Sequence, residues 1–152
     1  MSEPHRIRLR GPWDYEPLAE FVDAADGTVN ERVDDLPPAG RAAMPRDWRE
    51  MLGGDFRGRV RFCRRFSCPT GLEPGDRVEL VIDAVAGSAA VFLDDQPLGD
   101  VDPSAGSLRS DVSGRLSGRH ELVVEVQSPA TCVKDQPRGL TGEVRLEIFP
   151  AG

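Results

Sequence analysis

Large apolar residues and arginines alternate with a period of two along residues 56–66. This alternation is typical of a β-strand that buries one face and exposes the other. The residues predicted to face the core are Phe56, Val60, Phe62 and Phe66, and those predicted to face solvent are Arg57, Arg59, Arg61 and Arg65. Acidic side chains on neighbouring strands are expected to lie opposite these arginines. One such strand requires a sheet around it and a second layer to cover its apolar face.

Further short segments have the composition or the alternation of strands: 7–10, 28–33, 77–84, 90–93, 108–112, 121–126 and 142–149. Turn residues separate them, and residues 94–97 predict a tight hairpin. One helical turn is predicted over 45–52, with Gly53 and Gly54 ending it. Strands do not alternate with long helices, so the sequence predicts an all-β fold, an antiparallel β-sandwich or jelly roll.

The length of 152 residues predicts a single domain over residues 1–152. Within it, Trp13 and Tyr15 are expected to hold the N-terminal segment against the body of the domain. The formal charge of −7 argues against nucleic acids and anionic membranes as partners, because phosphate binding needs a basic face. No apolar signal follows residues 1–6 and no window approaches a membrane span, so a cytoplasmic protein is expected.

Three cysteines leave no obvious disulfide. Cys63 and Cys68 lie on one extended segment, too far apart along the chain to bridge each other. Cys132, on a predicted loop, is expected to be the most reactive thiol.

Several segments, taken in order, resemble the N-terminal sugar-binding domain of family 2 glycoside hydrolases, which include β-galactosidases and β-glucuronidases. The segments that carry this resemblance are 62–66, 91–99, 110–112, 118–126 and 139–148. The resemblance implies a galactose-binding-domain-like jelly roll. It also implies a non-catalytic carbohydrate-binding module rather than an enzyme, because the catalytic glutamates of that family lie in a separate barrel domain.

Residues 100–106 depart from the family, which has a histidine, a glycine pair and an aromatic residue near the sugar-facing edge. The departure motivates an alternative hypothesis, a protein-interaction or structural β-sandwich that has lost its sugar contacts. The partner is therefore expected to be a carbohydrate or, alternatively, another protein.

For a carbohydrate site the candidates are Trp48, Asp47 and Arg49. Sugars stack their C–H faces on flat aromatic rings while polar neighbours bind the hydroxyl groups. The competing interpretation places Trp48 in the core, where most tryptophans serve as anchors.

Other groups of polar residues give weaker evidence for a metal site or a catalytic site. The acidic residues Asp94, Asp95, Asp100 and Asp102 have oxygen ligands of the kind that calcium prefers, but their spacing is not that of a known loop, and a solvated turn is favoured. His120 is predicted to be a turn residue before a strand, and no triad is visible. No metal or cofactor is expected.

Overall fold

The computed structural model describes residues 3–103, 106–129 and 137–151. Within these residues it contains eleven strands and one short helix. In chain order they are β1 His5–Arg8, β2 Trp13–Asp23, β3 Val29–Arg32, β4 Gly40–Ala42, α1 Arg49–Leu52, β5 Gly58–Ser67, β6 Arg77–Ile82, β7 Ser88–Leu93, β8 Gln96–Val101, β9 Leu108–Asp111, β10 Arg119–Gln127 and β11 Val144–Phe149.

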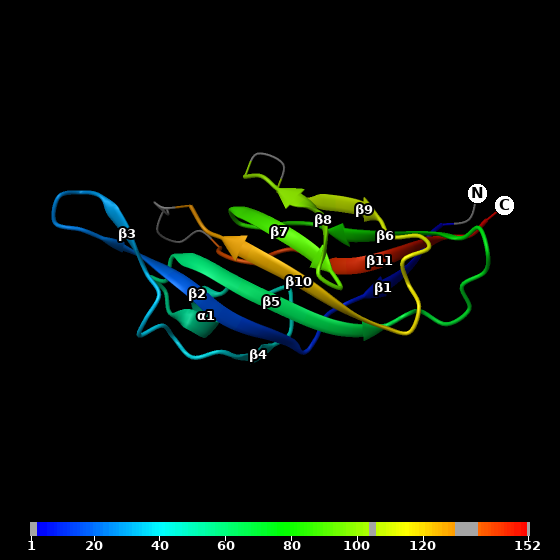
Figure 1. The fold of residues 1–152 in the computed structure, drawn as a ribbon, viewed down its shortest axis with the longest axis horizontal. Coiled ribbons are helices and arrows are strands. Elements are labelled where there is room, and N and C mark those ends of the chain that lie inside the picture. Colours follow the sequence, from blue (N-terminus) through cyan, green and yellow to red (C-terminus); the bar gives the residue numbers. More distant parts are fainter. Residues whose placement is uncertain (1–2, 104–105, 130–136, 152) are drawn as a thin grey trace.

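The strands form two sheets in which every pairing is antiparallel. One sheet has four strands in the order β1-β11-β6-β9, and the other has seven, in the order β3-β2-β5-β10-β7-β8 with β4 beside β2. Apolar side chains of both sheets form one core cluster between them. The predicted antiparallel β-sandwich is confirmed. Figure 1 shows both ends of the chain at one end of the molecule, where His5 of β1 lies opposite Ile148 of β11.

The predicted alternation of apolar residues and arginines is found in β5. Val60 and Phe62 are fully buried, and Phe66 is 8% exposed. On the other face Arg59 pairs with Glu31 at 2.9 Å and Arg65 with Glu121 at 3.3 Å. The prediction of an acidic partner on an adjacent strand is confirmed for Arg65, because Glu121 lies on β10, whereas Glu31 lies on β3, one strand beyond the neighbouring β2.

The hairpin of β7 and β8 turns through Asp94 and Asp95 alone. Both have positive φ, 50° and 65°, which is the backbone of a two-residue turn matched to the twist of the strands. The prediction of a hairpin is confirmed, with a turn two residues shorter than the expected 94–97 because Gln96 and Pro97 already belong to β8.

His120 belongs to a strand and not to the predicted turn. It lies inside β10 and is 6% exposed, not in a turn. Its Nε2 accepts the Ser117 amide at 2.9 Å, so Nδ1 carries the proton and donates to the Asp94 carboxylate at 2.5 Å. Burial opposes ionisation of that carboxyl, but the hydrogen bonds from His120 and the Glu121 amide outweigh it and lower the pKa of Asp94. The imidazole thus fixes the β7–β8 turn to the start of β10.

The long strand β2 was not predicted as a strand. Its register shifts between Pro17 and Ala19, and the proline has no amide hydrogen for the ladder. The expected anchoring role of Trp13 is confirmed, because its buried indole donates to the Leu9 carbonyl at 2.7 Å. Among the described residues, no helix combines the length and the hydropathy needed to cross a membrane.

Candidate functional site

Trp48, the aromatic candidate for sugar stacking, lies in the core. Its side chain is fully buried, its indole donates to the Phe56 carbonyl at 3.3 Å, and its ring packs edge-on against Phe56 with centroids 5.5 Å apart. The ring therefore presents no face to solvent in this structure, and a platform for a sugar needs one.

Asp47 and Arg49, the polar candidates, are side chains exposed by only 20% and 26%. The Asp47 carboxylate accepts the Arg49 amide at 3.0 Å, the Arg49 Nε at 2.8 Å and the Arg138 amide at 3.1 Å. Burial opposes ionisation, but these hydrogen bonds outweigh it and hold the pKa of Asp47 below its usual value. The carboxylate thus anchors α1 to the chain at Arg138. A ligand contact for Asp47 and Arg49 stays a prediction.

The four acidic residues considered for calcium do not converge. Asp94 and Asp95 form the turn before β8, while Asp100 and Asp102 lie toward its other end. Among the described residues no group of three or more His, Cys, Asp or Glu side chains is placed to hold a metal. Cys63 and Cys68 are unpaired and half-buried, and Cys132 lies outside the described residues.

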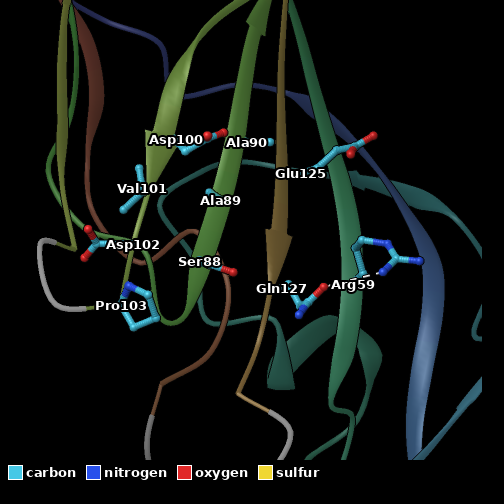
Figure 2. Close-up of a pocket in the computed structure, with 10 residues that line it drawn as sticks. All are labelled: Arg59, Ser88, Ala89, Ala90, Asp100, Val101, Asp102, Pro103, Glu125 and Gln127. Atoms are coloured by element: carbon cyan, nitrogen blue, oxygen red, sulfur yellow. Dashed lines mark hydrogen bonds between the residues drawn. The ribbon is translucent and has the colours of Figure 1, made fainter.

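A pocket that sequence reasoning missed lies on the outward face of the seven-stranded sheet, and we call it the sheet pocket. It has a volume of about 410 Å³ and is bounded by β5, β10, β7 and β8. Figure 2 shows its lining, which is Arg59, Ser88, Ala89, Ala90, Asp100, Val101, Asp102, Pro103, Glu125 and Gln127.

The pocket follows from the register of four strands. Gln127 lies opposite both Arg59 and Ser88, and Glu125 lies opposite Ala90, which in turn lies opposite Asp100. Side chains that alternate along a strand point to the same face when they are two residues apart. The small residues at 88 and 90 therefore form a low floor between rows of longer polar side chains.

The rim of the sheet pocket is acidic. It contains the carboxylates of Asp100, Asp102 and Glu125 and one guanidinium, that of Arg59. Arg59 is already paired with Glu31 at 2.9 Å and also lies 3.4 Å from the Gln127 side-chain oxygen, the contact drawn in Figure 2. Carboxylates and an amide are acceptors and donors suited to hydroxyl groups, whereas their excess negative charge repels anions.

A second hollow of about 510 Å³ lies on the same face across β5, between Asp14 and Glu16 of β2 and Arg61 of β5. Arg61 lies opposite Glu16 on one side and Glu125 on the other. Burial, and next the nearby Glu121 carboxylate, raise the pKa of the Cys63 thiol in this hollow. The outward face therefore offers a polar surface wider than one pocket.

Comparison with known proteins places the fold. No protein-family model and no curated protein matches the sequence. Among solved structures, an FMN-binding β-glucuronidase from Faecalibacterium prausnitzii L2-6 is 22% identical with a TM-score of 0.73 over 99% of this chain. A β-glucuronidase from Bifidobacterium dentium is 23% identical with a TM-score of 0.72 over 99% of the chain. A GH2 β-galacturonidase from Eisenbergiella tayi is 17% identical with a TM-score of 0.63 over 96%.

The chain spans 23% of the length of the first of these enzymes, 31% of the second and 24% of the third. At such identities the likeness concerns the fold. It agrees with the galactose-binding-domain-like β-sandwich that the sequence resemblance implies.

Proposed function

We propose that the chain is a non-catalytic carbohydrate-binding module, acting as a single domain over residues 1–152, that takes a neutral, hydroxyl-rich saccharide in the sheet pocket. The observation that carries this proposal is the low floor of Ser88 and Ala90 between polar rows in a pocket of about 410 Å³. Pockets of this size accommodate small ligands.

The fold likeness supports the class of ligand, because the similar structures include enzymes that are named for glycoside substrates. The absence of catalysis is proposed from the resemblance, because the catalytic glutamates of that family lie in a separate barrel domain and these residues correspond to only 23–31% of the two β-glucuronidases. A neutral saccharide is favoured over an acidic one because three carboxylates line the pocket and one arginine does.

Calorimetric titration with a panel of neutral oligosaccharides tests the proposal. The Ala90→Leu variant fills the floor of the pocket from an outward, half-buried position, so it should reduce affinity at least about tenfold without changing the unfolding temperature. The Arg49→Gln variant is the control, and it should bind as the unchanged chain does.

The opposite result, binding lost with Arg49→Gln and kept with Ala90→Leu, would assign the ligand to the site predicted around Trp48. If no neutral saccharide binds, the proposed function is wrong.

The alternative is a protein-interaction module, and the edges of the sheets favour it. Within the described residues β1 pairs only with β11 and β3 only with β2, so each leaves one backbone edge for a strand from a partner. Size-exclusion chromatography with light scattering and capture of partners from native extract distinguish the two functions. A monomer that captures nothing and binds saccharide would exclude the alternative.

A further inference from the structure

Arg64 occupies a position that the alternation of β5 reserves for the core. It lies two residues from Phe62 and two from Phe66, both of which are buried on the core-facing side. Its cross-strand neighbour on β10 is Leu122, which is fully buried. A charged side chain in such a row is costly unless a group of opposite charge compensates it.

The side chain of Arg64 lies at the side of the sandwich where the end of β5 faces β1. A cleft of about 380 Å³ opens there, and we call it the arginine cleft. Four arginines line it, namely Arg8, Arg64, Arg65 and Arg119. Its apolar lining includes Ile7, Leu9, Phe66 and Leu146.

Among the described residues, no acidic side chain lines the arginine cleft. Arg8 and Arg65 have carboxylate partners outside it, Glu143 at 3.0 Å and Glu121 at 3.3 Å. Arg64 and Arg119 have no ion pair within the part of the chain that the structure describes. The cleft is therefore a concentration of positive charge in a chain of net charge −7.

Arg64 is also incompletely satisfied. Its Nη1 donates to the Arg65 carbonyl, but its Nε is buried and has no hydrogen-bond partner among the residues that the structure describes. Buried donors are nearly always paired in folded proteins, so an orphan beside a cavity indicates a missing acceptor. A neighbouring hollow of about 260 Å³ is lined by Arg64, Arg65 and Arg119 as well, together with Asp14, whose carboxylate is paired with Arg41 at 2.9 Å.

We propose that the arginine cleft binds the carboxylate of a small organic acid. Guanidinium groups match planar carboxylates with two parallel hydrogen bonds, which favours a carboxylate over a compact inorganic anion. The apolar lining of Leu9, Phe66 and Leu146 would cover the body of the ligand, a contact that sulfate or phosphate has no carbon atoms to make. The volume suits one ring or a short chain rather than a polymer.

This site is distinct from the sheet pocket, because the two share no lining residue and have opposite charge. The inference thus goes beyond the proposed function, and either one can fail while the other holds.

Calorimetric titration with D-glucuronate as the probe tests the inference. D-Glucose serves as the matched neutral ring, acetate as the minimal carboxylate and sulfate as the compact anion. We expect glucuronate to bind more tightly than acetate or sulfate, and glucose to give no signal that depends on Arg64. The affinity for glucuronate should fall at least about tenfold in Arg64→Leu, which replaces the guanidinium by a side chain suited to the core-facing row.

Three variants complete the design. Arg119→Gln removes a second guanidinium from a more exposed position and should also weaken glucuronate binding, which keeps the test valid if Arg64→Leu does not fold. Arg46→Gln removes one positive charge outside the cleft and should bind normally. Ala90→Leu, which fills the sheet pocket, should leave glucuronate binding unchanged.

Four outcomes would overturn the inference. They are no binding of glucuronate, binding that both arginine variants retain, sulfate bound as tightly as glucuronate, and a hexaglutamate peptide bound more tightly than glucuronate. The last would indicate a protein segment as the occupant.

Discussion

Arginines occur both on the outward face of the four-stranded sheet and in the arginine cleft, but the balance of charge around them differs between the two places. On the sheet, Glu147 is 3% exposed and lies between Arg109 and Arg145, with both contacts at 2.7 Å. The hydrogen bond from Arg109 is the main reason that the pKa of Glu147 falls to about 2; burial opposes the shift and Arg145 adds to it. In the cleft, Arg64 has no ion pair with a carboxylate of the described residues.

The difference shows that local charge balance, more than residue type, indicates what an arginine does. In the network each guanidinium has carboxylate partners within the fold. Arg109 of β9 contacts Glu79 of β6 and Glu147 of β11, and Arg145 contacts Glu147 and Asp83. Such a network has its acceptors within the fold. In the cleft, Arg64 and Arg119 have no ion pair among the described residues, which is the condition for binding a carboxylate from a ligand.

The largest effect is expected from Glu147→Ala. This change leaves Arg109 and Arg145 around an empty position, and removal of one partner from a buried ion network costs about 3 kcal/mol in the free energy of unfolding. Urea denaturation measures it. Glu143→Ala, which removes a carboxylate that is 26% exposed, is the control and should cost less than about 1 kcal/mol. Equal losses for the two variants would contradict the distinction.

Lowering the pH should weaken the same ion network and reduce the free energy of unfolding. The pKa of Glu147 is lowered from 4.5 to about 2 in the folded chain, so its contribution is complete above pH 4.5 and is lost as the pH falls through about 2. Linkage gives a loss of about 2 kcal/mol from this group between pH 6 and pH 3. Urea denaturation across that range measures it. In Glu147→Gln this part of the pH dependence should disappear, and an unchanged profile would argue against the network.

The Arg119→Glu variant would give the arginine cleft a carboxylate of its own. We expect glucuronate binding to be lost, while stability rises by no more than about 1 kcal/mol because position 119 is exposed. Calorimetry and thermal unfolding measure the two quantities. Full retention of glucuronate binding would show that binding does not depend on the excess positive charge of the arginine cleft.

The smallest effect is expected from Arg65→Gln. Arg65 lies at the rim of the cleft, is 68% exposed, and is already paired with Glu121. Exposed pairs of this kind contribute less than about 0.5 kcal/mol, and salt screens them. Denaturation at low and high salt measures the change. A loss comparable to that of Glu147→Ala would remove the contrast between paired surface arginines and the buried network.

The sequence predicted the elements whose alternation is regular, such as β5, the β7–β8 hairpin and β11. It did not predict β2, where Pro17 and the register shift interrupt the pattern. The sheet pocket was missed for another reason. Its floor depends on Ser88 and Ala90 facing Gln127 and Glu125, and strand order and register are not visible in one sequence. The one sequence feature that could have indicated the pocket is the pair of small residues, Ser88 and Ala90, at alternate positions of one strand.

The site residues show the same limit. The sequence placed Trp48 in a predicted helical turn with Asp47 and Arg49 as its polar neighbours, but it does not say whether an aromatic ring is covered. The unusual place of Arg64 was readable from the alternation itself, because a charge interrupts the apolar row of Phe62 and Phe66. The sequence did not indicate that β1, which belongs to the other sheet, forms the opposite wall of the arginine cleft.

The antiparallel pairing of β1 with β11 sets how the molecule would respond to tension. The start of β1 lies beside the end of β11, with His5 opposite Ile148. A force that pulls the two ends apart would therefore load the hydrogen bonds between these strands one after another, as in a zipper, rather than all together. The ladder would open stepwise from His5 toward Arg8, so the sandwich would be mechanically weak along this direction whatever its resistance to heat or urea.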